Sequence, residues 1–239
     1  MRSTSVSDVL ATANAAMVRR DPDVTGALAT LLSGVVAALP ARAAAVLVEV
    51  DGGLELLAAS NHRVADLEAY QAQVDEGPCL DALRSGVEVH SVGGDDLEAR
   101  WPLAGPVIVA AGYRSVQALP LRWQGAVFGA LNVFREEEAG FADQQAECRA
   151  LADAVTLVIL SSQLGEERIV SGLHTALEER AVVEQAKGAL SHVLSVDMAA
   201  AFDALLALAD DQGLSLGNAA RRVMDRAGAG TLGSPSASS

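Results

Sequence analysis

Apolar residues near the N-terminus recur at helical spacing. This spacing predicts a helix over about residues 5–18, which Asp21-Pro22 ends. A second helix is predicted over residues 23–39, before Pro40, and its apolar stripe consists of Leu28, Leu31, Leu32, Val35 and Val36. The chain is therefore expected to open with two amphipathic helices.

The hydrophobic period then shortens to that of strands. Two apolar runs, 43–50 and 54–59, flank Asp51-Gly52-Gly53, and glycines supply the positive φ angles that a tight hairpin turn needs. Further strands are predicted at 87–90, 115–121 and 126–134.

Helical patterns separate these strands. One covers 64–74, a second runs from Pro78 to a C-terminal cap at Gly86, and a third runs from Pro102 to Gly112. The order predicts an α+β fold, a largely antiparallel sheet flanked by helices.

Few helix breakers occur between Phe141 and about His192, which predicts a long helix leaving the first domain. Its apolar stripe, Leu151, Val155, Val158 and Ile159, is typical of a helix that faces a partner helix. We therefore expect a homodimer, formed through the helices around 5–38 and 141–175.

The C-terminal part predicts a compact bundle of three short helices. Val183, Ala186, Leu190 and Val193 follow helical spacing on the first helix. Asp197 and Ser215 can cap the next two helices, and Gly213 can end the second. Ala201, Phe202, Leu205 and Ala209 are expected inside the second helix, and Leu216, Ala219, Ala220, Val223 and Met224 inside the third. The expected organisation is an N-terminal helix (1–22), a sheet domain (23–162), a helical domain (163–227) and a disordered Gly/Ser/Ala-rich tail (228–239).

Composition limits the function classes. Hydrophobic residues make up 51% of the 239 residues, so a core can be buried. The apolar stretches are too short to span a membrane and no secretory signal is visible, which indicates a cytoplasmic protein. The net charge of -14 opposes a general attraction to nucleic acid, so RNA binding would need a local basic surface.

Two stretches resemble known families. Arg180-Ala-Val-Val-Glu-Gln-Ala-Lys-Gly188 resembles the signature of ANTAR domains, and the apolar positions of that family recur over roughly residues 166–227. The resemblance implies an RNA-binding antiterminator that binds paired hairpins in a nascent transcript. Residues 24–162 resemble the GAF domains that precede ANTAR domains in actinobacterial regulators; the matching residues are Gln71, Gly77-Pro78-Cys79, Asp81-Ala82, Arg100-Trp101-Pro102, Gly112, Leu119-Pro120-Leu121 and Gly129-Ala-Leu-Asn132. That resemblance implies a small-molecule sensor and dimerisation module.

Four cationic side chains are the RNA-binding candidates: Arg180, Lys187, Arg222 and Arg226. Lysine and arginine bind phosphates by charge, and arginine also stacks on loop bases. We expect Val183, Ala186 and Leu190 to face the bundle core, which turns Arg180, Lys187 and Ser191 outward. The plainer interpretation is that Glu184 forms surface salt bridges with Arg180 and Lys187.

For the sensor domain we expect a pocket whose floor is formed by strands 43–50, 115–121 and 126–134, covered by residues 60–104. The candidates for its wall are Cys79, Trp101 and Trp123, and the ligand is an unknown small molecule. A helix N-terminus lowers a thiol's pKa, whereas a buried free cysteine behaves as a small hydrophobe; we favour the second interpretation for Cys79.

No phosphate-binding loop, dinucleotide fingerprint, nucleophile elbow or metal motif occurs, so we expect no enzyme, no cofactor and no metal. Two alternatives to the antiterminator stay open. The third helix carries Asn218, Arg221 and Arg222 and could read duplex DNA as a helix-turn-helix. Alternatively, the chain is a dimeric sensor that signals through protein contacts only, because residues 166–227 hold six Lys/Arg against ten Asp/Glu.

Overall fold

The computed structural model describes residues 5–17, 23–161 and 166–229. They divide into two compact units, residues 1–174 and residues 175–239. The predicted helix break at Asp21-Pro22, and the predicted tail beyond residue 229, lie outside the described residues.

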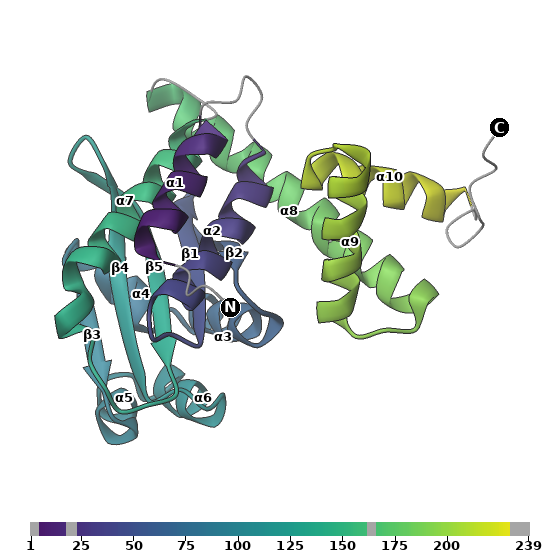
Figure 1. The fold of residues 1–239 in the computed structure, drawn as a ribbon. Helices are drawn as coiled ribbons and strands as arrows, with labels where there is room; N and C mark the ends of the chain where they lie inside the picture. Colours follow the sequence, from purple (N-terminus) through teal and green to yellow (C-terminus); the bar gives the residue numbers. More distant parts are fainter. Residues whose placement is uncertain (1–4, 18–22, 162–165, 230–239) are drawn as a thin grey trace. The chain divides into compact units, whose positions relative to one another are not determined.

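The first unit contains a five-stranded antiparallel sheet in the order β2-β1-β5-β4-β3 (Figure 1). The strands are β1 (Ala43–Val50), β2 (Gly53–Ala59), β3 (Val89–Val92), β4 (Ser115–Trp123) and β5 (Ala126–Arg135). The predicted β1–β2 hairpin is confirmed, and its turn residues Asp51 and Gly52 have φ of 54° and 78°. Gln124 and Gly125 repeat this arrangement between β4 and β5, with φ of 50° and 91°. Two successive positive φ angles match the right-handed twist of the flanking strands, which explains both tight turns.

Helices cover both faces of the sheet (Figure 1). On one face lie α1 (Val6–Met17), α2 (Val24–Ala38) and α7 (Gln145–Ser161), the last preceded by a short 3-10 turn, η1 (Ala142–Gln144). On the other lie α3 (His62–Val74), α4 (Pro78–Ser85), α5 (Gly94–Arg100) and α6 (Ala104–Ala110). Because β1 is covered on both sides, its residues from Ala43 to Val48 are all buried, which explains an apolar run with no alternation.

Three details differ from the sequence-based expectation. Helix α5 was not predicted, because Gly93-Gly94-Asp95-Asp96 has the composition of a loop, although Leu97 anchors the helix in the core. Strand β3 begins at Val89 rather than at Val87, which is 59% exposed. The described residues after Phe141 form two helices, α7 and α8 (Glu166–Leu194), rather than one continuous helix from 141 to 192; the residues between them lie outside the description.

The stripe on α7 that suggested a partner helix is buried within the chain. Leu151, Val155, Val158 and Ile159 are each at most 4% exposed, and α7 packs on α1, α2 and β4. This stripe is therefore part of the core of the sheet unit, and its use as evidence for a dimer was wrong. Among the described side chains of α7, the large apolar one that is exposed is Leu157, at 44%.

The second unit contains three helices, as predicted: the C-terminal part of α8, then α9 (Met198–Gln212) and α10 (Leu216–Gly228). Asp197 accepts from the Ala200 amide at 2.8 Å and Ser215 accepts from the Asn218 amide at 3.1 Å, so both predicted N-caps are confirmed. Gly213 ends α9 with φ of 60°. The core is formed by Val183, Ala186, Leu190, Ala201, Leu205, Ala209, Leu216, Ala219, Ala220 and Val223. Val193, which continues the helical spacing of the apolar residues on α8, is 39% exposed because α8 ends at Leu194.

Candidate functional site

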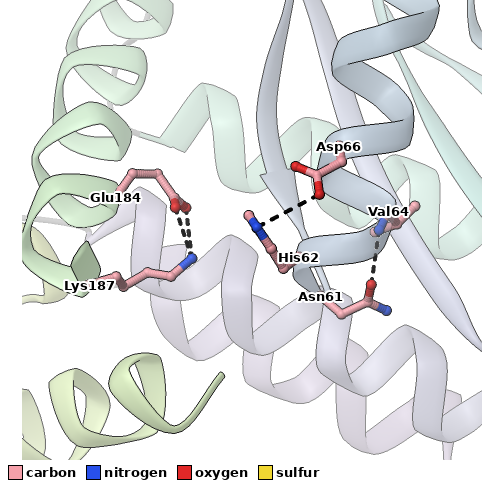
Figure 2. Close-up of polar contacts among 6 residues, drawn as sticks. All are labelled: Asn61, His62, Val64, Asp66, Glu184 and Lys187. Atoms are coloured by element: carbon pink, nitrogen blue, oxygen red, sulfur yellow. Dashed lines mark hydrogen bonds and ion pairs between the residues drawn. The ribbon is translucent and has the colours of Figure 1, made fainter. Parts of the chain in front are cut away.

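Lys187 lies against the bundle rather than facing outward. Its Nζ is 2.9 Å and 3.0 Å from the two Glu184 carboxylate oxygens (Figure 2) and 5.3 Å from the centre of the Phe202 ring. The Lys187 side chain is only 11% exposed. The outward orientation expected for Lys187 was therefore wrong: the residue follows buried Val183 by one helical turn, and its ammonium lies over the Phe202 ring of α9.

Arg222 is the best placed of the four RNA-binding candidates. It is exposed on α10, and its Nη1 donates to Gln212 Oε1 at 2.9 Å. This partner is a neutral amide, and no carboxylate pairs with Arg222 among the described residues, so its positive charge is uncompensated locally. Arg226, four residues further along α10, and Arg180 on α8 are partly exposed and have partners of their own.

Arg221, a candidate only in the DNA-binding alternative, is paired within the helical unit. Its guanidinium donates to Asn218 Oδ1 at 2.9 Å and pairs with Glu179 Oε1 at 3.2 Å. The same contact ties α10 to α8, so part of the charge on Arg221 is neutralised within the unit. Neighbouring arginines on one helix thus differ: Arg221 joins two helices, while Arg222 presents its charge to solvent.

A buried polar cluster lies between the sheet and helices α3 and α4. We call it the Glu68 cluster, and it consists of Glu68, Gln71, Cys79 and Asn132, each with no exposed surface. Asn61 caps α3 by accepting from the Val64 amide at 3.0 Å (Figure 2), and the helix it starts points Glu68 and Gln71 toward the sheet, one turn apart. Gln71 Nε2 donates to Glu68 Oε2 at 2.9 Å, and Asn132 Nδ2 donates from β5 to Glu68 Oε1 at 2.6 Å.

Burial dominates the electrostatics of this cluster. It raises the pKa of the Glu68 carboxyl to about 8, against the opposing effect of the Asn132 hydrogen bond. Burial also raises the pKa of the Cys79 thiol well above its ordinary value, with a further increase from the neighbouring Glu68 charge. The start of α4 does not overcome this desolvation, so Cys79 is the small buried side chain that we favoured.

The three pocket candidates do not converge. Cys79 and Trp101 belong to one core cluster on the α3–α6 face of the sheet, and Trp101 Nε1 donates to Asp81 Oδ2 at 3.0 Å. Trp123 is partly exposed at the end of β4, beside the β4–β5 turn, and is outside that cluster. Sequence reasoning missed Glu68; the available signal was a carboxylate within the apolar stripe of α3, between Leu67 and Gln71.

An open cleft of about 560 Å³ lies between the segment leading into β3, strand β4 and helix α7. It is lined by side chains including Val87, Glu88, Pro120, Arg122 and Arg149. Glu88 pairs with Arg149 and accepts from Gln145 at 3.1 Å, which ties α7 to the segment before β3.

The described residues contain neither a candidate metal site nor a single helix that could span a membrane. They contain no group of three His, Cys, Asp or Glu side chains arranged to hold a metal ion. Within the described ranges, no single helix has the length and apolarity needed to cross a membrane, and α8 and α9 reach that threshold only as a pair bent by 106°.

Family models match both parts of the chain. A model described as GAF domain matches residues 21–159, and one described as ANTAR domain matches residues 171–224. The search of curated proteins finds no match.

Solved structures resemble the sheet unit. The phycoerythrobilin-bound GAF domain of a cyanobacterial phytochrome is 16% identical, with a TM-score of 0.50 over 67% of this chain and 97% of that one. The GAF domain of a phosphoenolpyruvate-protein phosphotransferase from Coxiella burnetii is 17% identical, with a TM-score of 0.47 over 76% of this chain and 99% of that one. The type II free methionine-R-sulfoxide reductase from Thermoplasma acidophilum is 18% identical, with a TM-score of 0.40 over 50% and 79%. At these identities the likeness concerns the fold alone.

Proposed function

The chain belongs to the GAF domain family and carries a C-terminal ANTAR domain, the RNA-binding module of antitermination regulators, and from this premise we propose that it is a dimeric regulator which binds RNA hairpins in response to a small molecule. The GAF domain, proposed as residues 23–162, receives the signal. The ANTAR domain, proposed as residues 163–227, contacts the nascent transcript. Since nascent RNA is the proposed target, the proposed place of action is the cytoplasm.

The uncompensated charge of Arg222 is the observation that best supports RNA contact. Among the described residues the close partner of this exposed guanidinium is a neutral amide, which it can exchange for a phosphate without breaking an ion pair. Arg180 and Arg226 are proposed to add contacts from the same unit. Lys187 must release Glu184 before it can reach a phosphate, so we assign it the smallest part.

A non-enzymatic role agrees with the state of both cysteines. Cys79 and Cys148 are buried and free, and burial raises the pKa of Cys148 to about 11. Thiols with raised pKa hold little thiolate at neutral pH, which makes them poor nucleophiles and redox centres.

Hairpin RNA and duplex DNA of equal length should be compared by filter binding at several salt concentrations. We expect the full chain to prefer paired-hairpin RNA, with an affinity that falls as salt rises because phosphates are neutralised. A preference for duplex DNA would support the helix-turn-helix alternative. Binding of neither nucleic acid would support the alternative of signalling through protein contacts, which the excess of acidic residues favours.

A further inference from the structure

Two hydrogen-bond acceptors of the Glu68 cluster have no donor in the structure. Both Glu68 oxygens already accept an amide N–H, and the remaining amide oxygens, Gln71 Oε1 and Asn132 Oδ1, are buried without a donor. If the side-chain amide of Gln71 or Asn132 is rotated by 180°, its oxygen and nitrogen exchange places. The unpaired atom is then the nitrogen, and the amide oxygen faces a Glu68 oxygen, which is unfavourable unless Glu68 carries a proton. An unpaired buried polar atom is costly, and in the arrangement that the structure shows both unpaired atoms are acceptors.

When Glu68 is ionised, the described residues also supply no cation to pair with it. Among the described residues, no Lys, Arg or His side chain contacts the Glu68 carboxylate, whose only side-chain partners are two neutral amides. A buried carboxylate is normally paired with a cation or with several donors. In this cluster the protein supplies the Glu68 carboxyl and two amide oxygens, but the described residues supply no basic side chain to pair with them.

The neighbours of the orphan oxygens are small. On the sheet, Asn132 pairs in register with Ala45 of β1 and with Ala118 of β4, so only methyl groups flank it on its two sides. Gly77 covers Gln71 Oε1 from the α3–α4 turn, where a Cβ atom would lie 2.0 Å from that oxygen. Larger side chains at these positions would crowd both orphan oxygens.

We propose that the Glu68 cluster recognises a small organic cation with at least two N–H donors, an ammonium or amidinium group. The charge would pair with the Glu68 carboxylate, and the N–H groups would reach Gln71 Oε1 and Asn132 Oδ1, which supplies both missing features at once. A carboxylate or phosphate ligand would set acceptor against acceptor. The proposal rests on the proposed sensor role of the GAF domain and names the ligand class for it.

Proton release should accompany binding. Burial raises the pKa of Glu68 to about 8, and the other titratable group that faces it in the described structure is the neutral Cys79 thiol of α4. At pH 7 the Glu68 carboxyl therefore holds a proton that the ligand cation must displace. Affinity for a cation should rise about tenfold per pH unit up to about pH 8 and level off above it.

Three probes of almost equal shape separate the ligand classes: acetamidinium chloride, acetamide and sodium acetate. Each would be added at about millimolar to 100 mM concentration, because fragments of this size bind weakly. Sodium chloride keeps the ionic strength constant, and the melting temperature of the full chain is followed by tryptophan fluorescence. Both tryptophans, Trp101 and Trp123, lie in the GAF domain, so the signal reports on that domain. We expect acetamidinium to raise the melting temperature, and more so at pH 8 than at pH 6, while acetamide and acetate leave it unchanged.

Two variants that each replace a carboxyl group on α3 by an amide locate the effect. Glu68→Gln keeps the shape of the buried side chain and removes its charge, so the acetamidinium response should disappear. Asp66→Asn removes a carboxylate from the same helix, but the Asp66 side chain is 71% exposed and the response should be retained. If Glu68→Gln does not fold, the three probes and the pH series on the unchanged chain still distinguish a cationic ligand from a neutral or anionic one.

Stabilisation by acetate or acetamide without stabilisation by acetamidinium would overturn the ligand class while leaving the sensor role standing. The ligand class would also be overturned if none of the three probes changed the melting temperature, or if acetamidinium stabilised Glu68→Gln as much as the parent chain. RNA binding is measured independently, so its failure would contradict the proposed function of the ANTAR domain and not this inference.

Discussion

Glu68 is a carboxyl group placed where a carboxylate is unstable. It is fully buried, and its folded-state pKa of about 8 lies above its ordinary value of 4.5 because burial disfavours the charged form. Between these two values the folded chain keeps a proton that the unfolded chain releases. The contribution of this group to stability is therefore undiminished below pH 4.5 and decreases as the pH rises to about 8.

Stability measured against pH should show this loss. The free energy of unfolding of the GAF domain, followed by tryptophan fluorescence in urea, should fall relative to that of Glu68→Gln by up to about 1.4 kcal/mol per pH unit between pH 5 and 8. Asp66→Asn, with its exposed carboxylate, should keep the pH dependence of the parent. A constant difference between the parent and Glu68→Gln across this range would contradict the raised pKa.

Lys187 and Phe202 join α8 to α9 by a contact that is both apolar and electrostatic. The ammonium lies 5.3 Å from the ring centre, and the lysine stem is nearly buried. Lys187→Ala should lower the stability of the helical unit by about 1 kcal/mol, and Phe202→Ala by about 2–3 kcal/mol, less than for a fully buried ring because Phe202 is partly exposed.

Hydrogen exchange of the α8–α10 amides can measure both losses. The double variant should lose about 0.5–1 kcal/mol less than the sum of the single variants, because the two side chains interact. Arg222→Ala is the control and should change stability by less than about 0.5 kcal/mol, since the side chain is exposed. Strict additivity would mean that the contact contributes nothing.

At the scale of elements, turns and caps could be predicted from single residues. Asp51-Gly52 forms the β1–β2 turn, and Asp197, Gly213 and Ser215 bound the C-terminal helices as expected. Local backbone chemistry decides these positions, so sequence suffices. Helix α5 was missed because one buried contact, through Leu97, outweighs a loop-like composition. The Glu68 cluster was missed because its members come from three elements and only the fold brings them together.

Close packing of α5 on α6 depends on Gly105. A Cβ atom at this position would lie 2.3 Å from the Leu97 carbonyl oxygen, which is backbone and cannot move aside. Gly105→Ala should therefore destabilise the GAF domain by about 1–3 kcal/mol in urea unfolding. Gly94→Ala, on α5 itself, meets nothing closer than Val109 Cγ2 at 3.6 Å and should be nearly neutral. Equal effects of the two substitutions would contradict this account.

At the scale of the whole molecule, the proposed dimer now depends on surfaces other than the buried α7 stripe. Leu157 is the large apolar side chain that α7 leaves exposed, at 44%. If α7 contributes to the interface, Leu157→Glu should shift the chain from dimer to monomer in light scattering at tens of micromolar, roughly a weak-affinity threshold. Asp153→Glu, one turn earlier on α7, keeps the surface charge and should leave the mass unchanged. A parent chain that is monomeric under these conditions would contradict the proposed dimer.

Charge also acts at the molecular scale. The chain carries a net charge of -14, and its C-terminal region holds six Lys/Arg against ten Asp/Glu, so long-range attraction to RNA is weak. Any affinity must come from a few local contacts. A dimer would present two such surfaces to a paired hairpin and multiply a weak contact.

The salt dependence of hairpin RNA binding tests the central claim most directly. The logarithm of the affinity of the full chain should fall linearly with the logarithm of salt concentration. Arg222→Ala should weaken binding and lower the slope by about 0.7–0.9, the loss of one phosphate contact. Arg42→Ala removes a 69% exposed arginine of the GAF domain and should leave the slope as it is. A parent that does not bind hairpin RNA, or an Arg222→Ala chain that matches the parent in affinity and slope, would contradict the account.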